Sequence, residues 1–153
     1  KGIVTLSFDC EAKWGMADLS LNWTKELTDK NLVEVYDFDN TSGAISNPIT
    51  LQSSTFNRPY GVCFSPDGQV LYATTIDYSS GVGPTHIMQF DLNAGSQAAI
   101  FGSRFNVASV NDNYTYGQLS LALDKRIYVA KNNTNYLSVI TILLELAIRL
   151  SLI

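Results

Sequence analysis

The chain has 153 residues, of which 46% are hydrophobic, 11% aromatic and only 16% charged. This length is enough for one ordinary domain with a buried core and excludes two large domains. Ten Lys and Arg residues are scattered among fourteen Asp and Glu residues, which gives a formal net charge of −4. Because affinity for nucleic acid depends on clustered basic side chains, this balance argues against nucleic acid as a partner.

An apolar, strand-like run over residues 3–8 opens the chain and ends in Asp9-Cys10-Glu11. Two carboxylates at a strand end suit acid–base or metal chemistry, although turn and capping roles are commoner for such a pair. Residues 4–18 resemble the opening motif of NodB-type polysaccharide deacetylases. The resemblance implies that Asp9 is the catalytic general base. Cys10 stands where the family has a second Asp, so the metal-ligand role would pass to Glu11, with a divalent metal such as zinc as cofactor.

The deacetylase family also needs a later His-x-x-x-His pair and a further acid His, whereas this chain has a single His, His86. Three histidine roles cannot be filled by one side chain, so we expect no enzyme activity and no cofactor. A truncated, inactive polysaccharide deacetylase is the alternative. We expect His86 to be a strand residue with a satisfied ring, and Cys10 and Cys63 to be either a disulfide or two free thiols.

Residues 28–38 allow two interpretations. The deacetylase resemblance implies a helix capped by Thr28, with Leu32, Val35 and Tyr36 on one face. An internal repeat implies a strand over residues 32–38 instead, because residues 35–43 resemble residues 88–95. Two incompatible local preferences on one short string indicate a fragment or a chimera of two families.

The repeat continues through the middle of the chain. Tyr60-Gly61 recurs as Tyr116-Gly117 and Leu71-Tyr72-Ala73 recurs as Ile127-Tyr128-Val129, both 56 residues later. The pattern predicts strands over 61–64 and 70–75 around a turn at 65–68, a third strand over 86–92 and a fourth over 97–102. In the second unit it predicts a hairpin turn at 123–126 and a third strand over 136–140. Four short antiparallel strands per unit of about 55 residues are typical of a propeller blade.

Residues 60–72 and 87–92, and again 117–130 and 137–140, resemble the blade repeat of YVTN-type and WD40-like β-propellers of secreted bacterial surface proteins. The resemblance implies a mainly β fold with about two four-stranded antiparallel blades, which form an incomplete propeller over residues 39–140. It also implies an extracellular or cell-surface location and a non-enzymatic binding or scaffold function, with a protein or a carbohydrate as ligand. About two blades cannot close a ring, so we expect self-association through open blade edges.

The domain organisation predicted is therefore a deacetylase-like segment over 1–38, a partial propeller over 39–140 and an apolar tail over 141–153. The apolar run at residues 137–153 is short for a membrane span and contains Glu145 and Arg149, so we expect no span. Residues 141–152 either form a helix or extend a strand. The loops at 77–84 and 106–115 would lie on the rim of a propeller. Six aromatic side chains form either a sugar-stacking platform or cross-strand packing: Trp14, Trp23, Tyr78, Tyr114, Tyr116 and Tyr136.

Overall fold

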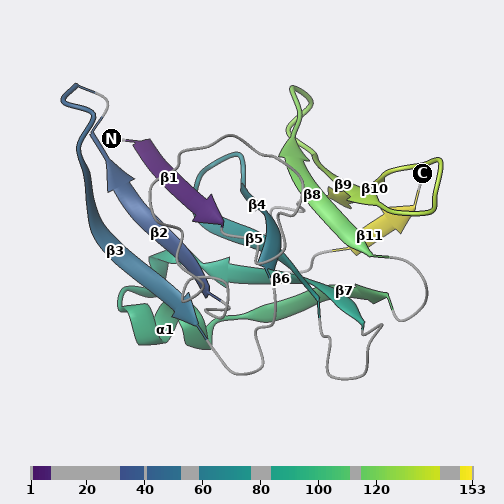
Figure 1. Cartoon of the computed structure of the whole chain (residues 1–153), viewed down its shortest axis with the longest axis horizontal. Helices are drawn as coiled ribbons and strands as arrows, with labels where there is room; N and C mark the ends of the chain where they lie inside the picture. Colours follow the sequence, from purple (N-terminus) through teal and green to yellow (C-terminus); the bar gives the residue numbers. More distant parts are fainter. Residues whose placement is uncertain are drawn as a thin grey trace, which may run out of the picture.

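A computed structural model describes residues 2–7, 32–39, 41–52, 59–76, 84–110, 115–141 and 149–152. These residues form three antiparallel sheets that follow one another along the chain (Figure 1). The predicted fold class, mainly β with two four-stranded antiparallel sheets, is confirmed. We number the sheets in chain order as the first, second and third sheet.

The first sheet has three strands in the order β1-β2-β3: β1 (Gly2–Ser7), β2 (Leu32–Phe38) and β3 (Ile45–Gln52). The helix implied over residues 28–38 is therefore wrong at residues 32–38, and residues 28–31 lie outside the described part of the chain. Val33 and Val35 are both buried against the second sheet. Alternate β-branched residues place their side chains on one face of a strand, which explains why this stretch is extended.

The second sheet has the order β4-β5-β6-β7: β4 (Pro59–Phe64), β5 (Val70–Ile76), β6 (Thr85–Asp91) and β7 (Phe105–Val110). The predicted turn joins β4 to β5. The Ser65 N–H donates to the Val70 carbonyl at 2.8 Å, and the Gly68 N–H donates to the Ser65 carbonyl at 2.9 Å. Gly68 has a φ of 72°, a conformation that glycine adopts without strain.

The fourth strand of this sheet is not where the sequence placed it. The segment predicted as that strand is α1 (Gln97–Gly102), which follows a short 3-10 helix, η1 (Leu92–Ala94). Ser96 caps α1 by accepting the Ala99 N–H. Ile100 is the residue of α1 whose side chain is buried. The fourth strand is β7, so residues 106–110 belong to a strand and not to a rim loop as predicted.

The third sheet has the order β8-β9-β10-β11: β8 (Tyr116–Leu121), β9 (Ile127–Lys131), β10 (Ser138–Thr141) and β11 (Arg149–Leu152). The predicted hairpin between β8 and β9 is confirmed. β10 starts at Ser138, two residues later than predicted. Of the two alternatives for the tail, the structure has strand at Thr141 and over β11, which corrects the helical alternative there. Residues 142–148 lie outside the described part.

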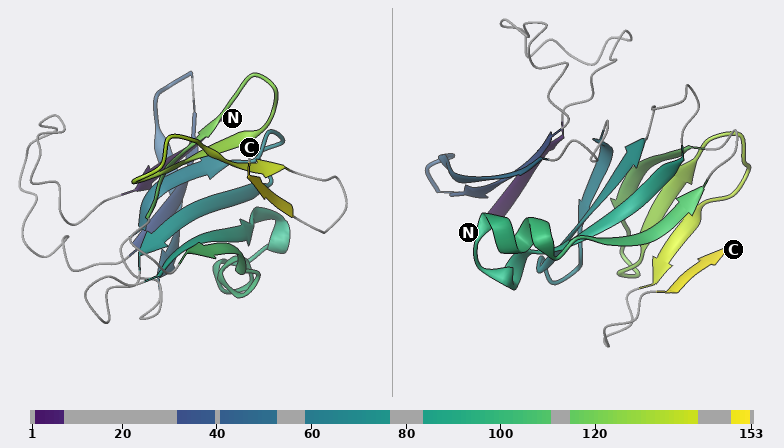
Figure 2. Two further views of the ribbon diagram at one scale, coloured as in Figure 1. Left: turned by 90° about the vertical axis from the view of Figure 1, so that its right-hand side faces the viewer. Right: turned by 90° about the horizontal axis from the view of Figure 1, so that it is seen from below.

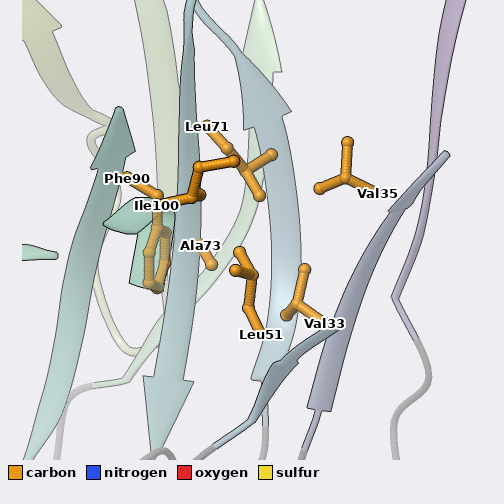
Figure 3. Close-up of a cluster of buried hydrophobic side chains, with 7 residues drawn as sticks. All are labelled: Val33, Val35, Leu51, Leu71, Ala73, Phe90 and Ile100. Carbon is orange, nitrogen blue, oxygen red and sulfur yellow. The ribbon is translucent and has the colours of Figure 1, made fainter. Parts of the chain in front are cut away.

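The second sheet is packed between the other two (Figure 2). Along β5 the side chains alternate: Leu71 and Ala73 face the first sheet, and Tyr72 faces the third. The core shared with the first sheet consists of Val33, Val35, Leu51, Leu71, Ala73, Phe90 and Ile100 (Figure 3). The core shared with the third sheet consists of Tyr72, Ile87, Tyr116, Leu119, Ile127, Val129 and Ile140. Burial on both faces explains why the strands of the second sheet are apolar at successive positions.

The second and third sheets repeat one pairing pattern. In both, the first strand carries an irregularity at the same place, between Pro59 and Val62 in β4 and between Tyr116 and Leu119 in β8. The second strands correspond at 56 residues, as the sequence predicted. The hairpin of the third sheet is one residue shorter, so the first strands correspond at 57 residues. The two Tyr-Gly dipeptides are therefore displaced by one position.

The first sheet corresponds to the last three strands of this unit. Asp37 pairs with Ile3 as Asp91 pairs with Val70, so β1 and β2 correspond to β5 and β6. Burial agrees, because Val33 faces the next sheet as its counterpart Ile87 does. β1 also contacts β4 as β5 contacts β8. Among the described residues, the first sheet has no counterpart of β4.

Candidate functional site

The two residues implied by the deacetylase resemblance, Asp9 and Glu11, lie outside the described residues, and their roles stay predictions. Within the described ranges, no three His, Cys, Asp or Glu side chains gather as a metal site would require. The described helices include none that is long and apolar enough to cross a membrane.

His86 lies on β6 and its ring is satisfied across the sheet. Its Nδ1 is 2.8 Å from the Ser109 Oγ on β7, and the Asn106 side-chain amide donates to that same Oγ at 2.8 Å. The expectation of a strand residue with a satisfied ring is confirmed. Cys63 is a free thiol on β4, and partial burial raises its pKa. Its Sγ is 3.4 Å from the Phe64 carbonyl oxygen, which agrees with the free-thiol alternative for this residue, and Cys10 lies outside the described residues.

The two described residues of the predicted aromatic platform have different environments. Tyr116 is buried between the second and third sheets, which confirms the packing interpretation for that side chain. Tyr136 is exposed in the connection before β10. Trp14, Trp23, Tyr78 and Tyr114 lie outside the described residues.

The backbones of β4 and β8 approach each other closely at Gly61. A Cβ on Gly61 would lie 2.8 Å from the Gly117 carbonyl oxygen, 2.9 Å from the Gln118 Cα and 3.1 Å from the Leu119 nitrogen. These are backbone atoms, so only glycine fits here. Thr74 joins the same strands, because its Oγ1 accepts the Gly61 N–H at 2.8 Å and donates to the Gly117 carbonyl at 3.0 Å. Glycine and a bridging hydroxyl together fix the spacing of the second and third sheets.

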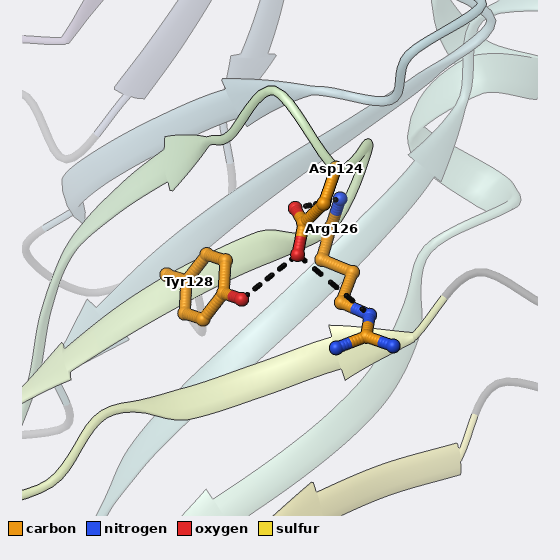
Figure 4. A network of polar contacts seen from close by, with 3 residues as sticks. All are labelled: Asp124, Arg126 and Tyr128. Carbon is orange, nitrogen blue, oxygen red and sulfur yellow. Dashed lines mark hydrogen bonds and ion pairs between the residues drawn. The ribbon is translucent and has the colours of Figure 1, made fainter.

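The hairpin of the third sheet carries a polar network (Figure 4). One Asp124 oxygen accepts the Arg126 backbone N–H at 3.1 Å, and the other accepts the Tyr128 hydroxyl at 2.9 Å. The Arg126 Nε lies 3.9 Å from the second oxygen. The hydrogen bond from the Arg126 backbone, with that from Tyr128 and the charge of Arg126, lowers the pKa of Asp124. The network fixes the Tyr128 ring beside the hairpin.

The second sheet has an Asp and a Tyr at the corresponding positions, but the Asp there has other hydrogen-bond partners. Asp67 accepts the Ser65 hydroxyl and the Gln69 backbone N–H, which lower its pKa. Tyr72, the counterpart of Tyr128, is buried by the third sheet, and this burial raises its pKa to about 12. An Asp turn followed by a Tyr therefore occurs twice: the Tyr of the second sheet is covered by the third sheet, and the Tyr of the third sheet donates to its Asp.

The outer face of the third sheet is the face that carries Tyr128. Ser120 pairs with Tyr128 across β8 and β9 and therefore lies on the same face, and it is exposed. Gln118 and Ala130 are also exposed. Gln118 occupies the position of Gly61, and Ala130 occupies that of Thr74. At these positions this face therefore has neither the glycine nor the bridging hydroxyl that hold the second sheet against the third.

The outer face of the first sheet carries a polar cluster on β2 and β3. Glu34 accepts the Tyr36 hydroxyl at 2.7 Å and the Thr50 hydroxyl at 3.1 Å. The hydrogen bond to Glu34, together with burial and the carboxylate charge, raises the pKa of Tyr36. The counterparts of Glu34 and Tyr36 in the second sheet are Met88 and Phe90, which pack against the first sheet. At these two positions the first sheet therefore has polar side chains where the second sheet has apolar ones.

Sequence reasoning did not find the network of Asp124 and Tyr128. A signal for it was present, because Asp67 and Tyr72 have nearly the same spacing in the preceding repeat. No protein-family model matches the chain, and no curated protein is significantly similar to it.

Proposed function

We propose that the chain is a non-enzymatic binding or scaffold segment of a secreted or cell-surface bacterial protein, built from propeller-type blades. The observation that carries this proposal is the repeated sheet. β4 to β7 and β8 to β11 share strand order, the irregularity in the first strand and a hairpin with an Asp turn.

The way in which the sheets contact one another supports the same proposal. β4 lies against β8 with backbone in contact at Gly61, and each pair of neighbouring sheets buries its own apolar cluster. In propellers and other repeat proteins, each unit covers the apolar face of its neighbour, so stability comes from the stacked array. An array of this kind is a rigid support on which loops can present a binding surface.

The alternative, a truncated polysaccharide deacetylase, has less support. The helix that this alternative requires through residues 32–38 is a strand with Val33 and Val35 in a shared core. Only one histidine is present to fill three roles, and it bonds to Ser109 across the second sheet.

The two functions are separated by two assays on the full chain. The first measures retention of the fluorescently labelled protein on insoluble chitin, peptidoglycan and collagen. We expect saturable retention on at least one of them, and no retention on any would contradict the proposal. The second measures acetate release from acetylated chitooligosaccharide with zinc. We expect none, and a release that Asp9→Asn abolishes would establish the deacetylase instead.

A further inference from the structure

A cluster of three polar side chains lies on β6 and β7, the two neighbouring strands at one edge of the second sheet (Figure 1). It consists of His86 on β6 and of Asn106 and Ser109 on β7. Asn106 and Ser109 are exposed and His86 is partly exposed. The cluster is therefore accessible to molecules in solution.

A β-bulge in β7 brings Asn106 and Ser109 to the same histidine ring. The pairing of β6 with β7 shifts between Ile87 and Met88, which leaves Val107 without a partner in β6. In a regular strand, side chains three residues apart lie on opposite faces. The extra residue reverses this alternation, so both side chains contact the ring. Bulges are frequent beside active sites because they redirect side chains in this way.

The contacts within the cluster determine which groups donate. The Asn106 Nδ2 is an amide nitrogen, which can only donate; it lies 2.8 Å from the Ser109 Oγ and 3.3 Å from the His86 Nδ1. The Nδ1 therefore accepts, and the ring hydrogen is on Nε2. The Ser109 hydroxyl consequently donates to Nδ1, at 2.8 Å. The proton of Ser109 thus points at a nitrogen that can remove it.

This arrangement has the parts that acyl transfer to a serine requires. An imidazole bonded to a serine hydroxyl takes its proton as the oxygen attacks, which makes a weak nucleophile reactive. An amide N–H close to the attacking oxygen can donate to the acyl oxygen, on which negative charge develops. The Asn106 amide, 2.8 Å from the Ser109 Oγ, is in place to do so.

We propose that Ser109 is a modification site whose Oγ takes an acyl group from an activated ester, with His86 as the base and Asn106 as the N–H donor. The Oγ forms a bond to the acyl carbon, and its proton moves to the His86 Nδ1. The bond between the acyl carbon and the leaving oxygen breaks, and that oxygen keeps the electron pair. The product is a serine ester on the chain. The modification goes beyond the binding or scaffold function proposed above and does not depend on it.

The test is the rate at which individual serines of the full chain are acetylated by p-nitrophenyl acetate, followed by peptide mapping with mass spectrometry. Ser120 is the internal control, because it is also an exposed serine on a strand, whereas the single histidine of the chain is bonded to Ser109. A positioned base usually accelerates such a step by about 10²–10⁴-fold, so we expect Ser109 to be acetylated faster than Ser120 by about tenfold or more.

Two variants test the roles of the other groups. His86→Gln removes the imidazole and is expected to lower the rate at Ser109 by about tenfold or more, to that of Ser120. Asn106→Ala removes the amide donor and is expected to lower the rate at Ser109 by about tenfold. Asn93→Ala is the matched control, because it removes an exposed amide in η1, at the other end of β6, and leaves the rate unchanged. Circular dichroism and urea unfolding check that each variant is folded, and His86→Ala replaces His86→Gln if the latter is not.

Two results would overturn the proposal. They are acetylation of Ser109 no faster than that of Ser120, and a rate at Ser109 that the folded His86 variant leaves unchanged. Neither result depends on retention of the chain on a polymer, so a failure here is distinguishable from a failure of the proposed function.

Discussion

Gly61→Ala tests whether the spacing of the second and third sheets depends on a missing side chain. The new Cβ would lie 2.8 Å from the Gly117 carbonyl oxygen and 2.9 Å from the Gln118 Cα. Ordinary carbon contacts are about 3.5–4.0 Å, so the backbone of β4 or β8 must move by several tenths of an ångström. Neither atom is at the end of a flexible side chain, and the strain therefore has to be taken up by the sheets themselves.

The expected loss is about 1–3 kcal/mol of unfolding free energy, which is the usual range for overpacking a close contact. For a chain of this size, that corresponds to a decrease in Tm of about 2–12 °C. Urea unfolding followed by circular dichroism measures the first quantity, and a thermal scan measures the second.

Gly102→Ala is the matched control. Nothing lies within 4 Å of a Cβ built on Gly102, and its φ is not in the left-handed region. Because Gly102 ends α1, alanine is expected to leave stability unchanged or to raise it by up to about 1 kcal/mol. An unfolding free energy of Gly61→Ala within about 0.5 kcal/mol of the parent would refute the close approach of β4 and β8.

Three further outcomes are expected. Thr74→Val keeps the side-chain shape but leaves the buried Gly61 N–H and Gly117 carbonyl without their hydroxyl partner. This change is expected to lower the unfolding free energy measured in urea by about 1–3 kcal/mol, whereas Thr74→Ser, which keeps the hydroxyl, retains most of the parent's stability. Asp124 has a lowered folded-state pKa, so it stabilises the fold above its unfolded pKa of about 3.9 and loses this effect as the pH falls through the folded value. Urea unfolding midpoints measured against pH should show that Asp124→Asn is less stable than the parent at neutral pH and equally stable in acid. Tyr72 has its pKa raised to about 12, so its stabilising effect is complete below the unfolded pKa of about 10 and is lost as the pH rises through 12. Ultraviolet titration should show a tyrosine that ionises near pH 12 and that Tyr72→Phe removes, and a titration curve that Tyr72→Phe leaves unchanged above about pH 11 would contradict this.

The local features of the fold were predictable from the sequence because they depend on nearby residues. The turn at residues 65–68 follows from Pro66, Asp67 and Gly68, each of which restricts or permits a particular backbone angle. The 56-residue repeat of the second strands correctly predicted two sheets with one pattern, because alternation along a strand sets which side chains share a face. The strand predicted over 97–102 was wrong, although Ser96 is a capping residue that distinguishes a helix from a strand there.

Other features were decided only by packing between segments that are far apart in the chain. Whether residues 32–38 become helix or strand depends on the core that Val33 and Val35 share with the second sheet. The hairpin of the third sheet is one residue shorter than that of the second, so Gln118 and not Gly117 occupies the position of Gly61. The effect of this shift appears only where β4 lies against β8.

Tyr72 and Tyr128 show the distinction most directly. They stand at the same place in one repeat, and the sequence by itself determined that both lie on the second strand of a sheet beside an Asp turn. Only the tertiary structure decided that Tyr72 is buried and holds its proton to about pH 12, while the Tyr128 hydroxyl donates to Asp124 on an outer face. The physical reason is that burial depends on whether another sheet covers the residue, which no neighbouring residue in the sequence specifies.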